Sequence, residues 1–526
     1  CAMPHWHCLN AGQAMSAHSW IVGYDMANNT VRCENSYSNL RNGRSSTGLS
    51  NLSCTNRIQI MTNAASAIAV PSTPPVVQQL LDERAIAYRE VLDHPGLDPN
   101  SKVQAVLLED TAGALMVLFA QSQLLDLNRL ADLIGRRMSA VAADRLKELL
   151  DKHGLSQLPG LPSITRSSCL YEDHLLQQPL LLISSGEPGL LLEITREGFQ
   201  RLLGIANSGR FGEPLSEIKL NLNRPDDDSE AITHAVQAFT ARRIQQRLEA
   251  TIEIPPLAES VRKIMRLRVD PDVTIDEITS VVETDPALAA QVMSWASSSY
   301  YAAPSKIRSV EDAIVRVLGV DLVINLALSL SLGKTLSLPN DHPQTSTPYW
   351  QQSIYTAAVI EGLTRAMPRD QRPEVGLTYL AGLLHNFGYL LLAHVFPPHF
   401  SLICRHLEVN PHVSHSVIEQ HLLGISREQM GAWLMRYWGM PDELVTALRS
   451  QHDPDYTGIH AQYPNLVCVA LGLLRSRAIG QGACAPLPKA LFERLGVSRE
   501  KAEDAVSKVL EAEVLLREMA NTLSQA

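Results

Sequence analysis

The sequence is short of cysteine, of long apolar runs and of positive charge, and each shortage excludes a class of protein. The eight cysteines form no CxxC pair and no regular spacing, which argues against a disulfide framework or a zinc site. The apolar run at residues 322–333 is shorter than the ~20 residues that a bilayer helix needs. The formal charge of -10 argues against a dominant nucleic-acid surface. We therefore expect a cytoplasmic protein that enters no membrane.

The length predicts several domains, because 526 residues exceed what one hydrophobic core organises. Residues 1–60 begin with Cys, are rich in Asn and Ser, and show neither helical nor strand periodicity. We expect them to be a disordered, non-native upstream segment, with Met61 as the native start; a secreted cysteine-rich module is the alternative. Residues 61–75 end in a proline-rich run that a helix cannot cross, and are predicted to be a linker.

Residues 76–205 alternate helical and strand-like patterns. Strands are expected at residues 104–108 and 114–119, separated by a turn whose Asp and Gly suit a hairpin. A second strand pair is expected at residues 180–184 and 190–194, with helices before, between and after the pairs. These patterns predict a mixed α/β domain.

The order of these patterns is similar to that of a known family. The first helix, the run VLLED…ALMVLFAQSQLLDL, the turn HGLSQLPGLPSI and the segment YEDHLL resemble the YbaK-like, or aminoacyl-tRNA-deacylase, domain. The resemblance implies hydrolysis of mischarged tRNA and makes tRNA a partner of this domain. Family members carry a Lys where this sequence has Gln104, whose neutral amide supplies no charge to the ester carbonyl. Lys102 lies on the same strand face as Gln104 and would take the place of the missing family Lys after a register slip. Without such a slip, the deacylase site is degenerate.

Three further segments surround the second domain. Residues 206–228 contain an acidic run and are predicted to be a linker, and residues 229–253 a connecting helix. Residues 456–526 are predicted to be a helical extension, and their last helix has an apolar seam. This seam would either pack back on the chain or pair two chains as a homodimer.

From residue 254 the sequence predicts an all-α domain, because helix-start signals recur and each helix has one apolar stripe. The start signals are Thr274 with Glu277, Asp285 before a proline, and Ser309 with Asp312. Blocks in residues 254–455 resemble the HDOD domain, among them IPPLA, ETDPALAAQVMSWASS, SVEDAIVRVLG, AGLLHNFGYLLL and GAWLMRYWGMPDELVTALRSQH. The resemblance implies an orthogonal helical bundle with a regulatory role, related to the HD metal-dependent phosphohydrolases.

An HD-type phosphohydrolase needs several His and a carboxylate around one or two divalent ions. The positions that resemble those ligands hold Gln352, the pair His385-Asn386, and His452, while Arg427 and its neighbours stand where catalytic relatives have a His. Two imidazoles without an anionic partner make a weak site for a hard ion, so we expect no metal and no other cofactor. The four residues are then either buried polar groups or donors and acceptors of a small-ligand pocket.

Other His and Trp residues of this domain are expected to be structural. Trp433 and Trp438 are interpreted as core anchors. Six histidines crowd the segment after the central apolar helix, and most are expected on loops or exposed helix faces. They are His394, His399, His406, His412, His415 and His421.

Together these patterns predict a multidomain protein with a YbaK-like α/β domain followed by an all-α bundle. The favoured hypothesis is a bacterial-type signalling protein that binds a protein partner or a small signalling ligand without catalysis. An aminoacyl-tRNA deacylase that uses Lys102, and a residual HD-type phosphohydrolase, are the alternatives.

Overall fold

The computed structural model describes residues 20–25, 30–35, 71–244, 259–269, 272–297, 301, 307–333, 335–482 and 485–525. Residues 1–70 and 71–526 form separate units. In the first unit, strands β1 (Trp20–Asp25) and β2 (Thr30–Asn35) pair antiparallel. The expectation that this segment has no strand was therefore wrong for these two stretches. The rest of the prediction for residues 1–60 lies outside the described residues.

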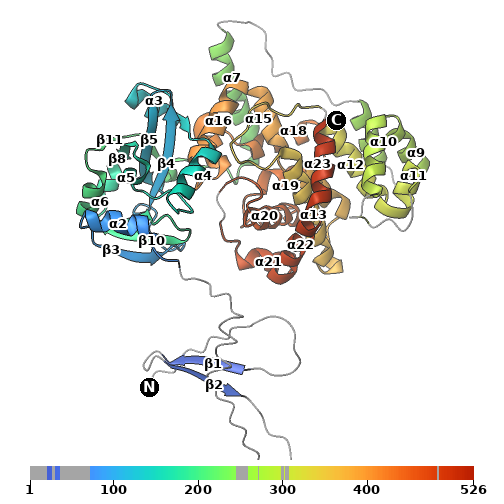
Figure 1. The fold of residues 1–526 in the computed structure, drawn as a ribbon. Helices are drawn as coiled ribbons and strands as arrows, with labels where there is room; N and C mark the ends of the chain where they lie inside the picture. Colours follow the sequence, from blue (N-terminus) through green and yellow to red (C-terminus); the bar gives the residue numbers. More distant parts are fainter. Residues whose placement is uncertain are drawn as a thin grey trace, which may run out of the picture. The chain divides into compact units, whose positions relative to one another are not determined.

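The N-terminal part of the second unit is built on two sheets (Figure 1). One has the strand order β3-β10-β9, and the other β11-β8-β5-β4-β7. The bounds are β3 Tyr88–Leu92, β4 Val103–Asp110, β5 Gly113–Ala120, β7 Ser139–Ala140, β8 Ser168–Glu172, β9 Leu180–Ser184, β10 Leu190–Thr195 and β11 Asn207–Gly209. Strands β6 (Gln123–Leu125) and β12 (Gly212–Pro214) pair separately. Both predicted strand pairs are confirmed, and Asp110 accepts the Gly113 amide in the predicted turn.

Helices cover the sheets of this region. They are α2 Pro75–Glu83, α3 Leu127–Ile134, α4 Ala143–Lys152, α5 Pro162–Thr165 and α6 Arg196–Leu203. Helix α3 begins where Asp126 caps it, with Oδ1 accepting from the Asn128 amide at 2.8 Å. It ends at Gly135, whose φ of 71° is left-handed and suits glycine. The mixed α/β class predicted for this region is confirmed.

The rest of the unit is helical. Its helices include α7 Asp228–Ile244, α8 Glu259–Val269, α9 Ile275–Glu283, α10 Pro286–Ala296, α11 Val310–Ala313, α12 Val320–Gly333, α13 Tyr349–Ala366, α14 Val375–Leu384 and α15 Phe387–Val395. They continue with α16 Pro397–Val409, α17 His415–Leu423, α18 Arg427–Tyr437, α19 Asp442–Ser450, α20 Gln462–Arg475, α21 Lys489–Leu495, α22 Arg499–Glu511 and α23 Glu513–Gln525. The predicted capping box of Thr274 with Glu277 is present, and Ser309 caps α11 by accepting the Asp312 amide.

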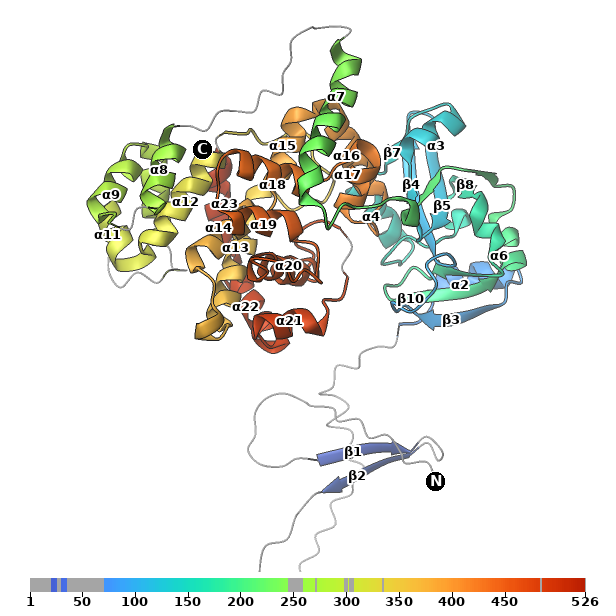
Figure 2. The same cartoon turned by 180° about the vertical axis from the view of Figure 1, so that it is seen from behind.

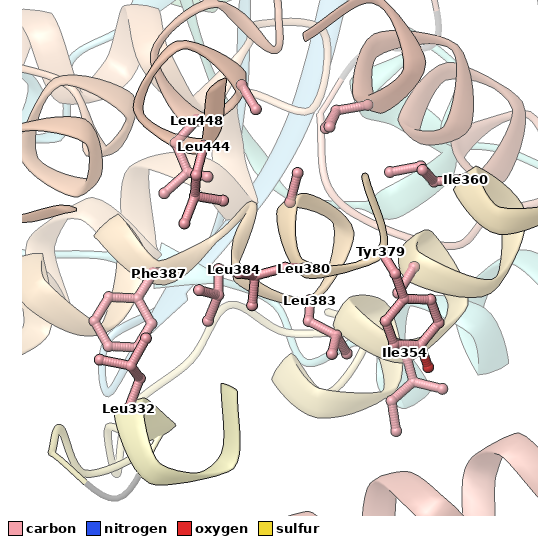
Figure 3. Close-up of a cluster of buried hydrophobic side chains, with 14 of the residues drawn as sticks. Leu332, Ile354, Ile360, Tyr379, Leu380, Leu383, Leu384, Phe387, Leu444 and Leu448 are labelled. Atoms are coloured by element: carbon pink, nitrogen blue, oxygen red, sulfur yellow. The ribbon is translucent and has the colours of Figure 1, made fainter. Parts of the chain in front are cut away.

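Helix α14 lies at the centre of this bundle and continues, after a break at His385-Asn386, into α15. Val375–Val395 is long and apolar enough to cross a membrane, but 89% of its most apolar window is buried inside the protein, as in a core helix. Figure 3 shows Leu380, Leu383 and Leu384 of α14 among apolar side chains of neighbouring helices. A Cβ at Gly382 would lie 2.5 Å from the Ala357 Cα, so glycine here allows α13 and α14 to touch.

The C-terminal helices pack on α13, as Figure 2 shows for α20 and α22. The seam predicted from the sequence is buried in the same core as α13. Its buried members are Ala502, Ala505, Val509, Leu516 and Met519. The seam therefore packs back on the bundle, which is one of the two arrangements that the sequence left open.

Candidate functional site

The two deacylase-like positions lie on strand β4 or just before it. Lys102 precedes the strand, and its Nζ is 2.8 Å from the Asp93 Oδ1, so an ion pair already engages the ammonium. Gln104 is half-buried and lies opposite Phe119 of β5. Cross-strand partners project from the same sheet face, so Gln104 and Phe119 share one face with Val106 and Leu108.

That sheet face packs against the helical bundle. Val409, the last residue of α16, belongs to the same apolar cluster as Leu108, Val117 and Phe119. The His412 ring lies 5.6 Å from the Phe119 ring, and its Nε2 is 2.9 Å from the Gln123 carbonyl oxygen. Burial lowers the pKa of His412, which favours a neutral imidazole whose Nε2–H donates to that carbonyl. The bundle thus covers the face that carries Gln104.

Hydrogen bonds also join the α/β region to the helical bundle at this contact. The Asn410 side chain accepts from the Leu125 amide at 2.7 Å and donates to the Leu125 carbonyl at 3.0 Å, as a neighbouring strand would. The His406 Nε2 accepts from the Leu127 amide at 3.2 Å, and the His421 Nε2 lies 2.9 Å from the Asp126 Oδ2. Burial opposes ionisation of Asp126, but the neighbouring imidazoles of His406 and His421 and the hydrogen bond from the Asn128 amide hold its pKa well below the usual value.

The expectation that most of the six histidines lie on loops or exposed faces was therefore wrong. His406 and His415 are buried, and His421 on α17 contacts the other domain. His412 lies in the loop between α16 and α17, as expected, but it also contacts that domain. His394 is exposed, as expected. A sequence signal was present in Asn410-Pro411-His412, a run of polar and turn-forming residues between two apolar helices. It could not reveal the contact, because the partner groups at residues 123–127 are mostly backbone atoms.

The HD-like pair lies at the break between α14 and α15. The His385 Nδ1 donates to the Gly382 carbonyl at 2.7 Å, and the His385 carbonyl accepts from the Gln451 side chain at 2.7 Å. Burial lowers the pKa of His385 to about 4, so its ring is neutral at pH 7. Its Nε2 therefore carries a lone pair, and it has no hydrogen-bond partner within the described part of the chain.

A guanidinium stands beside the second residue of the pair. The Arg427 Nη1 donates to the Asn386 Oδ1 at 3.2 Å. The buried carboxylate of Glu419 accepts from the Arg427 Nε at 2.5 Å and from its backbone amide at 2.7 Å. The guanidinium carbon also lies 5.0 Å from the centre of the Tyr389 ring. A Cβ at Gly388 would overlap the Arg427 carbonyl, so glycine is required for this approach.

These groups do not fit a metal ion at the HD-type position. A fixed positive charge occupies the place beside Asn386, the Glu419 carboxylate is neutralised by the same arginine, and the Asn386 amide oxygen already accepts a hydrogen bond. Gln352 lies on α13 and is buried, and no hydrogen bond joins its side chain to His385, Asn386 or His452 among the residues described. The four predicted residues therefore do not form one hydrogen-bonded group.

A different group converges nearby. The His415 Nε2 lies 2.6 Å and the His452 Nε2 3.4 Å from the same oxygen, the Glu428 Oε1. The two imidazole rings are 4.8 Å apart at 73°. Of the predicted site residues, His452 alone belongs to this group; His415 and Glu428 were missed because residues 13 or more apart in sequence meet only through the packing of α17, α18 and α19.

A cavity of about 290 Å³ opens beside this group. Its lining includes His415, Glu428, His452, Arg449 and Arg475. Arg449 is held by Asp228 at the start of α7, with Nη2 3.0 Å from Oδ1, and Gln429 donates to the same oxygen at 2.7 Å. Asp228, which the sequence placed at the end of a linker, is thus a buried support of the cavity wall.

Comparison with known proteins identifies both regions. The HDOD domain family model matches residues 254–454, and the aminoacyl-tRNA editing domain model matches residues 82–202. A proposed signal transduction protein from Marinobacter aquaeolei VT8, known from its crystal structure, is 42% identical with a TM-score of 0.80; the match covers 86% of this chain and all of that one. The chain belongs to the HDOD domain family.

This HDOD protein shares both of its regions with the Marinobacter protein, because a match over 86% of the chain extends well beyond the HDOD domain. An HDOD domain protein of unknown function from Geobacter sulfurreducens is 22% identical, with a TM-score of 0.44 over 56% of this chain and 99% of that one. Curated proteins gave no match. The resemblances to the HDOD and aminoacyl-tRNA editing families inferred from the sequence are both confirmed.

Proposed function

We propose that this HDOD protein is a regulatory protein that acts by binding, and that the cavity beside His415, Glu428 and His452 is its sensing site. The HDOD match and the signal transduction relative support the regulatory role. The observation that carries the proposal is Arg427 at the HD-type position, because its guanidinium replaces the metal that phosphohydrolysis needs while a polar cavity remains next to it. A small signalling ligand or a protein partner, met in the cytoplasm, is the proposed input or output.

The editing-like domain is proposed as the second binding module, coupled to the cavity through residues 410–415, which we call the coupling segment. At one end of the coupling segment, Asn410 and His412 bond the backbone of Leu125 and Gln123. In its middle, Val413 packs with Leu124. At the other end, His415 bonds Glu428 in the cavity. A change in the cavity would therefore reach the other domain over six residues.

Hydrogen exchange tests this coupling. We expect His415→Ala to speed amide exchange at residues 123–127 by roughly threefold or more, because the coupling segment loses its attachment to Glu428. The matched control is His460→Ala, since His460 lies 3.7 Å from the Glu443 carboxylate at a partly exposed position. Exchange at residues 123–127 should stay at the wild-type rate in the control. Wild-type exchange there in His415→Ala, in a protein with an unchanged unfolding temperature, would overturn the coupling.

A deacylase is the second candidate, since the editing-domain model matches residues 82–202. Two observations oppose it: the Lys102 ammonium is paired with Asp93, and the bundle covers the sheet face of Gln104. We expect purified protein to release amino acid from mischarged tRNA no faster than the buffer does. Release above that rate in the wild type, lost in Lys102→Ala and kept in the surface variant Lys152→Ala, would establish the deacylase instead.

A further inference from the structure

The His415, Glu428 and His452 group is a compact set of metal-ligating side chains. One ligand atom from each residue can be chosen so that all three lie within 4.8 Å of one another. Both His415 and Glu428 are buried, with side chains 7% and 5% exposed, whereas His452 is 23% exposed. This group is separate from the HD-like pair, whose amide is bound to Arg427. The cavity beside it gives an ion a route to all three side chains.

The geometry of the group shows which atoms face an ion. The His415 Nε2 and the His452 Nε2 both lie close to the Glu428 Oε1, at 2.6 Å and 3.4 Å. Because a carboxylate oxygen accepts, the His415 Nε2 donates its proton to it in the metal-free protein. An ion bound between the three side chains takes the place of such protons, since metals bind neutral imidazole nitrogens and ionised carboxylate oxygens.

We propose that His415, Glu428 and His452 bind one divalent transition-metal ion of the zinc type. Two imidazoles and one glutamate form a ligand set that zinc accepts, with a fourth position left for water. Ligand atoms around zinc lie about 2.0–2.2 Å from the ion, hence roughly 3.4 Å apart in a tetrahedral site. The His452–Glu428 distance is already 3.4 Å, and the His415–Glu428 distance of 2.6 Å must open by less than about 1 Å.

Arg475 competes with the ion. Its Nη2 lies 3.3 Å from the His452 Nδ1, and because a guanidinium only donates, that nitrogen accepts and the ring proton sits on Nε2. When an ion binds at Nε2, the ring proton has to sit on Nδ1. Two donors, this N–H and the Arg475 Nη2, would then face each other, so Arg475 must move away from the ring. Metal-ligating histidines normally donate their other N–H to an acceptor. Arg475→Gln supplies such an acceptor, removes a positive charge, and is expected to bind the ion more tightly.

This inference rests on the proposed function in one respect, namely that the cavity is the sensing site. The ion is then either the sensed ligand or a fixed part of the sensing site. No hydrolytic role is assigned to the ion. The coupling test by hydrogen exchange is carried out on metal-free protein. If exchange at residues 123–127 speeds up in His415→Ala but no metal binds, the metal proposal is wrong and the coupling stands. If metal binds but exchange does not change, the coupling is wrong and the metal proposal stands.

The test is titration of the full chain, stripped with a chelator, with Zn²⁺ against a chromophoric competitor and with Co²⁺ by visible absorption. We expect one ion per chain at this site and the absorption of four-coordinate Co²⁺. Glu428→Gln and His415→Ala should weaken binding by roughly 100-fold or more, Arg475→Gln should strengthen it by roughly tenfold, and His460→Ala should leave it unchanged.

Arg475→Gln keeps all three ligands, so it tests the site even where a ligand variant does not fold. Absence of bound ion in both the wild type and Arg475→Gln would overturn the proposal. So would binding that persists unchanged in folded Glu428→Gln and His415→Ala, because the ion would then lie elsewhere on the chain.

Discussion

Arg427→Ala is expected to lower the free energy of unfolding by about 3–5 kcal/mol, since removing one member of a buried ion pair leaves an uncompensated charge. Arg427 and Glu419 are 3% and 0% exposed, and their side chains meet at 2.5 Å. In the variant the Glu419 carboxylate keeps the backbone amide of residue 427 but loses the guanidinium. Urea unfolding followed by circular dichroism measures the difference.

Two further variants show whether the pair causes the loss. Arg436 lies on the same helix α18 but is exposed, and Arg436→Ala should change stability by less than about 0.5 kcal/mol. Replacing both partners with apolar residues, as in Glu419→Leu with Arg427→Met, should recover most of the loss, because no buried charge remains unpaired. A loss below about 1 kcal/mol in Arg427→Ala would mean that water reaches Glu419, contrary to its burial.

The secondary structure could largely be predicted from local patterns. The strand pairs at β4–β5 and β9–β10 followed from short apolar runs separated by turns that contain glycine. The helix starts at Thr274 and Ser309 followed from capping residues. Strands β1 and β2 were missed, because they lie in a polar segment without clear alternation.

The candidate site could be predicted only in part. From Asn386 and Arg427 the sequence predicts that no metal binds at the HD-type position, and this stays a prediction; the structure adds that Arg427 bonds Asn386 directly. The group of His415, Glu428 and His452 was not expected. Local sequence predicts an exposed position for a histidine in a polar segment. His415 is buried beside a carboxylate only because α17 packs against α18. Tertiary contacts between distant helices are the information that local patterns lack.

Burial, together with nearby positive charge, explains why the His385 ring stays neutral in the core. A buried imidazole is costly when charged, and positive charges on Arg427 and Arg475 make its protonation still less favourable. The ring therefore remains neutral, with Nδ1 bonded to the Gly382 carbonyl. Arg427 thus adds to the effects that favour the neutral form of the neighbouring histidine.

This arrangement predicts acid sensitivity from His385. Its pKa is about 4 in the folded protein against a usual value of 6.5. Between those values the unfolded chain binds a proton at His385 and the folded chain does not. The free energy of unfolding is therefore unaffected by His385 above about pH 6.5, and it falls as the pH drops toward about 4. This difference between the two pKa values corresponds to about 3 kcal/mol of unfolding free energy. His385→Gln, which does not titrate and can still donate to the Gly382 carbonyl, removes this dependence.

We expect the wild type to lose about 2.5 kcal/mol more stability than His385→Gln when the pH falls from about 7.5 to about 4.5. Urea unfolding of both proteins at each pH, with a chelator present, measures this difference, and the other titrating groups cancel because both chains contain them. His460→Gln, a partly exposed histidine, should behave like the wild type. Equal losses in the wild type and His385→Gln would show that the buried ring accepts a proton in the folded protein, and would contradict the neutral imidazole at the centre of the bundle.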